Sequence, residues 1–174
     1  ECFLPPGEDA SCPYFWPIGN RYIFLFFSHT TGSQYLLGDY NKEEHCFYPT
    51  FHGRFNFMSF LPGGVHAPSA TSDGKGGVIV IHNMHTGKKS PGWRGITTLP
   101  RKLTLDKCDT INIQPYGDYK SLRTHHQHID KTHLPANKEI IIDNIQGNAL
   151  EIKAEINIKS SPMIEMNVLR SPDK

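Results

Sequence analysis

The sequence predicts an all-β protein, because helical periodicity is almost absent and short apolar runs recur along the chain. Gly, Pro, Asn and Asp separate these runs, which is typical of a β-sandwich, a barrel or a propeller. The run at 77–82 (GVIVIH) is continuously apolar, which predicts a strand covered on both faces. The predicted strands are residues 22–28, 34–39, 54–58, 78–83, 95–98 and 102–105.

Turn residues connect these strands in order. Glycine-containing segments at 31–33, 62–64 and 72–77 have the composition of tight turns. Ahead of the first strand, residues 12–18 (CPYFWPI) form an apolar, aromatic segment that is expected to be buried, and Gly19-Asn20 predicts the turn that follows it.

The composition changes in the last third of the chain. Residues 119–135 are rich in His, Lys and Thr and poor in apolar residues, which predicts a linker with a short helix at 119–123. Residues 150–158 then alternate apolar and polar side chains, as a half-exposed strand does. Together with 139–145 and 163–169 they predict a meander that begins a second all-β domain.

Composition and charge argue against several classes of function. The 18 Lys and Arg nearly balance the 17 Asp and Glu, and no basic patch with interleaved aromatics occurs, so no nucleic-acid partner is expected. No apolar run approaches the roughly 20 residues of a membrane-spanning helix, so no membrane association is expected. The four cysteines never form a CxxC pair, so their spacing does not indicate a zinc site. The cluster of His125, His126 and His128 is interpreted as part of a solvated linker and not as a metal site.

Two adjacent carboxylates, Glu8 and Asp9, stand just ahead of the aromatic segment 12–18. A carboxyl group at the edge of an apolar pocket has a raised pKa, which a general acid working near neutral pH requires. The sequence therefore makes Glu8 and Asp9 candidate acids, and the competing interpretation is a surface loop with two solvated carboxylates.

Four segments, in chain order, resemble motifs of glycoside hydrolase family 32, the β-fructofuranosidases (invertases, levanases and inulinases). Residues 12–18 are similar to the family's ECPDFFPL segment, and residues 35–40 (YLLGDY) are similar to its YxIGxYD strand. Residues 65–69 (VHAPS) resemble the FYAPQ strand, and residues 92–101 resemble the GWxxxMTLPR segment. The resemblance extends over nearly the whole chain.

The resemblance implies a five-bladed β-propeller followed by a β-sandwich. In this chain, residues 1–124 would form the C-terminal blades of the propeller, 125–136 a linker, and 137–174 the first strands of the sandwich. The family's nucleophile lies in a WMNDPNG motif and its transition-state-stabilising Asp in an RDP motif, and neither motif occurs here. The chain is therefore expected to be the rear part of a longer protein and to be inactive by itself.

The resemblance also implies roles for individual residues. The family's general acid/base is a Glu directly before the Cys of ECPDFFPL, and Ser11 stands at that position here. Glu8 is the first candidate for this role and Asp9 the second. Glu1, whose neighbour is a Cys, is the third candidate, although the residues after it do not continue the motif. Cys12 is expected to be a buried thiol beside the site, and the candidate sugar contacts are Asp39, Asn56, His66 and Trp93.

The function implied is cleavage of sucrose or fructans with retention, by a carboxylate nucleophile from outside this chain and a general acid/base within it. This chemistry needs no metal ion and no organic cofactor, and the sequence does not indicate an oligomeric state. Two alternatives remain: a related arabinan-cleaving five-bladed propeller, and a non-catalytic carbohydrate-binding propeller, which the Ser11 replacement would suit.

Overall fold

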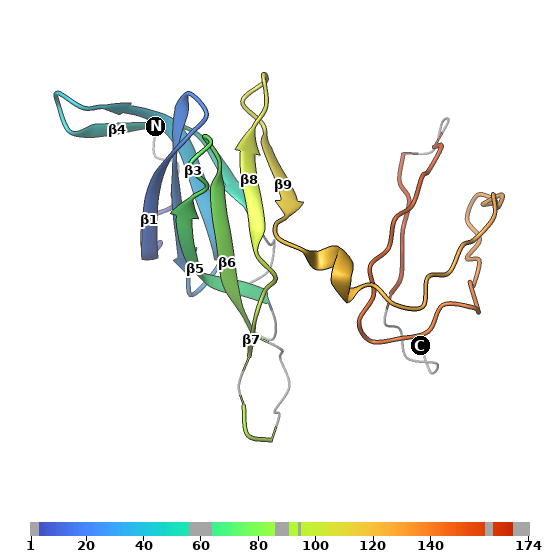
Figure 1. Ribbon diagram of the computed structural model, residues 1–174. Helices are drawn as coiled ribbons and strands as arrows, with labels where there is room; N and C mark the ends of the chain where they lie inside the picture. The colour runs from blue at the N-terminus through green and yellow to red at the C-terminus, as the bar shows by residue number, and fades with distance from the viewer. Residues whose placement is uncertain (1–3, 56–63, 86–90, 94, 159–161, 169–174) are drawn as a thin grey trace. The chain divides into compact units, whose positions relative to one another are not determined.

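The computed structural model describes residues 4–55, 64–85, 91–93, 95–158 and 162–168 (Figure 1). The chain divides into two compact units, Glu1–Tyr119 and Lys120–Lys174, which are described separately. All strands assigned to the described residues belong to the first unit, where they form two antiparallel sheets. The prediction of an all-β protein is thereby confirmed. None of the helices in these ranges is long and apolar enough to span a membrane.

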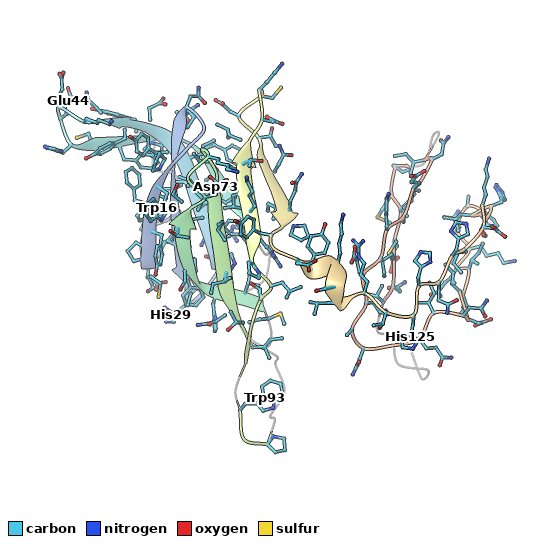
Figure 2. The ribbon with its side chains drawn as sticks, viewed as in Figure 1. Trp16, His29, Glu44, Asp73, Trp93 and His125 are labelled. Carbon is cyan, nitrogen blue, oxygen red and sulfur yellow. The ribbon has the colours of Figure 1, made fainter. Side chains whose placement is uncertain are left out.

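The first sheet has the strand order β1-β2-β3-β4, and every neighbouring pair is antiparallel. Short turns connect the strands in sequence, so the sheet is an up-and-down meander, the form of a propeller blade. The β3–β4 hairpin, which carries Glu44, projects beyond the other strands (Figure 2). The strands are β1 (Ser11–Ile18), β2 (Arg21–Ser28), β3 (Gly32–Asn41) and β4 (Cys46–Arg54).

The second sheet has the order β5-β6-β8-β9, and the short β7 pairs with the end of β6. It is also an antiparallel meander (Figure 1). Its strands are β5 (Gly64–Ser72), β6 (Val78–His85), β7 (Ile96–Thr97), β8 (Arg101–Leu105) and β9 (Ile111–Pro115).

The predicted strands at 22–28, 34–39, 78–83 and 102–105 correspond to β2, β3, β6 and β8. β1, β4 and β9 were not among the predicted strands, and most of their side chains are partly or fully exposed. The predicted strand at 54–58 lies mostly outside the described residues, which show a strand over 46–54 instead.

The two sheets pack against each other, with β5 lying across β1, β2 and β3. Alternation along the strands directs one set of side chains from each sheet into the interface. Burial of these side chains stabilises the fold by about 1.5–3 kcal/mol for each large aliphatic side chain. The fully or nearly fully buried residues of this core are Ile18, Ile23, Leu25, Leu37, Val78, Val80 and Leu103.

An ionic cluster around Arg21 joins the two sheets at one end. The Arg21 side chain is only 13% exposed, and its Nε lies 2.7 Å from Oδ1 of Asp39 on β3. The same guanidinium binds Asp109 in the β8–β9 turn and donates a 2.5 Å hydrogen bond to Thr50 Oγ1 on β4. Because its donors reach residues of both sheets, Arg21 acts as a clamp between them.

Asp73 organises the β5–β6 turn. Its Oδ1 accepts hydrogen bonds of 2.7 Å from the amides of Lys75 and Gly77, and its Oδ2 lies 2.6 Å from Nζ of Lys102 on β8. The interaction with Lys102 and the two amide bonds lower the pKa of Asp73 to about 2. The predicted turn at 72–77 is therefore held by one carboxylate.

The second unit differs from its prediction. A 3-10 helix, η1 (Tyr119–Leu122), matches the predicted short helix, but no strand is assigned to the described residues 123–158 and 162–168. The expected meander is therefore not formed there. A half-exposed strand needs a neighbouring backbone to complete its hydrogen bonds, and the alternating side chains that should form its apolar face, Leu150, Ile152, Ile156 and Ile158, are exposed. The sandwich and the domain boundaries at 124 and 137 stay predictions.

We predict that Leu103→Ala lowers the free energy of unfolding by about 3 kcal/mol, because the substitution leaves a cavity where β8 packs into the core. Chemical denaturation monitored by tryptophan fluorescence measures this change. The matched control is Leu99→Ala, since the Leu99 side chain is 61% exposed. Equal effects of the two substitutions would contradict the assigned core.

Candidate functional site

Glu8 lies in the segment before β1, and the β2–β3 turn supplies its partner. The Glu8 amide donates a 3.1 Å hydrogen bond to the carbonyl of Pro5, which closes a turn just before the strand begins. Oγ1 of Thr31 donates a 2.8 Å hydrogen bond to Oε2 of Glu8. The other carboxylate oxygen, Oε1, is buried and has no hydrogen-bond partner within the described residues.

The pKa of Glu8 is lowered, contrary to the raised value that the sequence predicts. Burial acts to raise the pKa of Glu8, but the polar groups of Ser28, Thr31 and Gln34 and the Asp9 amide together outweigh it. The aromatic segment alone suggested an apolar pocket, whereas the fold places hydroxyl and amide groups against the carboxylate. Glu8 is therefore ionised in the free protein at neutral pH.

Asp9 has a different set of partners. Its Oδ2 lies 2.6 Å from Nδ1 of His29 and accepts a 2.8 Å hydrogen bond from Oγ of Ser11, and its Oδ1 accepts one of 3.0 Å from the His29 amide. The His29 ring and the Ser11 hydroxyl lower the pKa of Asp9. The two adjacent carboxylates are therefore both held in the charged form, each by its own donors.

A bulge interrupts the first strand of each sheet at an equivalent place. In β1 the register shifts between Ser11 and Tyr14, and in β5 it shifts between His66 and Pro68. Each bulge contains a residue with positive φ directly before a proline: Cys12 at +52° and Ala67 at +43°. Bulges re-aim side chains at strand ends, and strained backbone of this kind is frequent at functional sites.

The bulge in β1 turns Cys12 toward solvent. The thiol was expected to be buried beside the site, and the structure shows it exposed and not in a disulfide. The sequence-based expectation is therefore wrong for this residue.

His66 lies at the same end of the two sheets as Asp9. The ring of His66 makes an edge-to-face contact with Phe27, with centroids 5.3 Å apart, and Phe27 lies 4.9 Å from the ring of His29. Because His29 binds Asp9, a continuous series of contacts connects the start of β5 to the segment before β1. Asp9 and His66 are therefore connected through the side chains of Phe27 and His29.

Trp93 lies between β6 and β7 in the chain. Asn83 of β6 pairs with both His66 and Thr97, so the β6–β7 connection begins beside the bulge of β5. The Trp93 side chain is 51% exposed and lies away from the strands of the second sheet (Figure 2). It is therefore available to a ligand without being part of the packed site.

Asp39 does not belong to this group of residues. It lies six residues beyond Ser33 along β3, a separation of about 20 Å, and it is paired with Arg21. Its role as a sugar contact stays a prediction, and its pairing with Arg21 places it apart from Glu8 and Asp9. Glu1 and Asn56 lie outside the described residues. Within those residues no cluster of three or more His, Cys, Asp or Glu side chains is placed to hold a metal ion.

The structure adds polar residues that the sequence interpretation missed. His29 and Thr31 lie in the β2–β3 turn, Gln34 is fully buried on β3, and His52 lies on β4. One signal was visible: Gln34 is a long polar side chain directly before the apolar run of a predicted strand. A buried amide needs partners, and those partners come from β4 and the turn.

A buried histidine, His82, lies on β6, where it pairs with Pro68 of the β5 bulge. Its side chain is fully buried, its ring is 5.0 Å from that of Phe55, and neither ring nitrogen has a hydrogen-bond partner within the described residues. Burial, with smaller effects from Arg101 and His66, lowers the pKa of His82 to about 4. His82 is therefore neutral at neutral pH and packs as part of the core.

Comparison with known proteins leaves the family open. No family model matches the chain. No curated protein matches it either. Among solved structures, the chain is similar to a glycoside hydrolase family 32 structure from Bifidobacterium adolescentis, with 15% sequence identity and a TM-score of 0.49. The match covers 64% of this chain and 19% of that one, so the chain spans about a fifth of the length of that structure. A likeness at this level does not assign the family.

We predict that His82 makes the protein less stable as the pH falls from about 6.5 to 4. In this range the unfolded chain, with an ordinary histidine pKa of about 6.5, binds a proton that the folded protein excludes. The decrease in the free energy of unfolding that His82 causes approaches about 3 kcal/mol at pH 4 and is absent above pH 7. Denaturation curves across this range measure it.

In His82→Leu the decline between pH 6.5 and 4 should be shallower than in the wild type. The exposed His125 provides the control, and His125→Leu should leave the pH dependence unchanged. Identical slopes for the wild type and His82→Leu would contradict the assignment of His82 as a buried neutral group.

Proposed function

We propose that this chain is the acid/base part of a glycoside hydrolase of the family-32 type, which cleaves sucrose or fructans with retention. The observation that carries the proposal is the position of Glu8 and Asp9 directly before β1, at the end of the sheets where His66 lies near the start of β5. In a propeller the first strands of the blades surround the central channel, where groups from several blades converge. The four sequence motifs, in the family's order, support the same proposal.

The proposed reaction has two steps. First, Glu8 in its protonated form donates its proton to the glycosidic oxygen while a carboxylate outside this chain forms a bond to the anomeric carbon, and the alcohol leaves. In the second step, ionised Glu8 takes a proton from water as the water oxygen attacks the same carbon and releases the carboxylate. The enzyme returns to its starting state, and two displacements give retention.

The lowered pKa of Glu8 suits the second step directly. For the first step, the carboxyl group must bind a proton before it reacts. A bound sugar excludes water from the site, and this desolvation raises a carboxyl pKa. The proposal therefore requires the pKa of Glu8 to be higher in the complex with substrate than in the free protein.

His66 and Trp93 are the proposed sugar contacts among the described residues. His66 lies near the start of β5 and contacts Phe27, which in turn contacts the His29 ring that binds Asp9. Trp93 offers an exposed ring on the neighbouring hairpin, and apolar ring faces suit the C–H face of a sugar. Asp39 is not included, since it lies in the Arg21 clamp.

A second candidate function is binding of carbohydrate without catalysis. The observation in its favour is that both Glu8 and Asp9 are held in the charged form, with Ser11 at the position of the family's catalytic Glu. Ionised carboxylates are strong acceptors for sugar hydroxyls and need no shift of pKa for that role.

The experiment is an assay of fructose release from sucrose, inulin and levan by the complete gene product that contains this chain. Under the hydrolase proposal, Glu8→Gln lowers kcat about 10²–10⁴-fold, because the amide can neither donate nor accept the proton. The matched control is Glu44→Gln on the exposed β3–β4 hairpin, which should retain full activity.

The other outcomes are equally informative. Full activity in Glu8→Gln would overturn the assignment of Glu8 and transfer the role to Asp9 or Glu1. Binding of a fructan without any fructose release by the wild type would overturn the hydrolase proposal and support the carbohydrate-binding alternative.

A further inference from the structure

Three hydrogen bonds connect Glu8 to His52 across the first sheet. Thr31 Oγ1 donates to Glu8 Oε2 at 2.8 Å, and Gln34 Nε2 donates to Thr31 Oγ1 at 2.6 Å. Oε1 of Gln34 then lies 2.6 Å from Nε2 of His52. The chain of bonds therefore passes from the segment before β1, through the β2–β3 turn and β3, to β4.

The positions of the Gln34 amide atoms imply one direction for the bonds in this series. The Gln34 amide nitrogen donates to Thr31, so the Thr31 hydroxyl hydrogen is directed at Glu8. The Gln34 amide oxygen can only accept, so this arrangement requires the His52 tautomer with a hydrogen on Nε2. All three donors thus point toward the carboxylate end, which favours the ionised form of Glu8.

The surrounding packing holds this arrangement in place. Gln34 is fully buried, and the ring of His52 stacks near that of Phe26, with centroids 6.5 Å apart. Oγ of the buried Ser28 accepts 3.1 Å hydrogen bonds from the amides of Thr30 and Thr31, which fixes the β2–β3 turn and with it the position of the Thr31 hydroxyl.

We propose that Thr31, Gln34 and His52 are positioning residues that hold the Glu8 carboxylate in one orientation and couple its protonation to that of His52. The inference rests on the proposed role of Glu8 as the working carboxylate. In that role, the hydrogen-bonded series of Thr31, Gln34 and His52, here called the relay, sets the pH range in which Glu8 is charged before substrate binds. None of the three residues needs to touch the sugar.

Several charged groups contribute to this coupling. Protonation of His52 stabilises the charged form of Glu8, and charged Glu8 in turn favours protonated His52. Burial, and then the charge of Arg54 on the same strand, lower the pKa of His52 and so oppose its protonation. The other charged pair near this segment is Asp9 with His29, in which Asp9 follows Glu8 in the chain and His29 lies in the β2–β3 turn.

Titration of the Glu8 side-chain carboxyl by carbon-detected NMR tests the relay without any substrate. Thr31→Val removes the final donor and is expected to raise the pKa of Glu8 by about one unit. Thr31→Ser keeps the hydroxyl and should restore a pKa close to that of the wild type. An unchanged Glu8 pKa in folded Thr31→Val would overturn the proposal.

The tautomer of His52 provides a second readout, in the wild type itself. Nitrogen chemical shifts should show neutral His52 with its proton on Nε2, and Gln34→Met should shift the population toward the other tautomer. A wild-type His52 protonated on Nδ1 alone would contradict the relay, even if every variant failed to fold. Because neither measurement involves turnover, failure of the relay is distinguishable from failure of the hydrolase proposal.

Discussion

The burial of one apolar face from each of two meander sheets is the constraint on which the first unit depends. Residues such as Leu25 on β2 and Val80 on β6 are completely removed from water in this interface. These side chains fill the middle of the interface, and a cluster of charged side chains lies at each of its two ends. One end holds the Arg21 clamp, and the other holds Glu8, Asp9 and His29.

The two ends use charge differently. At the Arg21 end, the guanidinium forms ion pairs with the carboxylates of Asp39 and Asp109, and these ion pairs join the two sheets. At the other end, Glu8 receives a neutral hydroxyl donor in place of a cation. A carboxylate stabilised by neutral donors retains its capacity to interact with an incoming ligand, whereas one in a tight ion pair does not. This difference favours the Glu8 end as the functional one.

The β2–β3 turn links the fold to the chemistry of this end. Ser28 holds the turn from within, while His29 and Thr31 reach outward to Asp9 and Glu8. A change in the pairing of β2 with β3 would therefore move both donors at once. The carboxylates depend on the correct register of the sheet, not only on their neighbours in sequence.

Part of this arrangement was predictable from the sequence. The runs that became β2 and β6 are apolar enough to indicate strands without knowledge of their partners, and the position of Glu8 before an aromatic segment indicated a candidate site. The charge state of Glu8 was not predictable, because its donor Thr31 is 23 residues away. The place of Asp39 was also not predictable, since it depends on the register of β3 and on a clamp residue from β2.

The central claim is that the end of the sheets that carries Glu8 is the surface that meets carbohydrate. Amide chemical-shift mapping with a fructo-oligosaccharide tests it most directly, because both ends of the sheets are observed in one experiment. The account predicts concentration-dependent shifts at His29, Thr31 and His66, with none at Asp39 or Asp109. Shifts confined to the Arg21 end, or no shifts at saturating oligosaccharide, would contradict it.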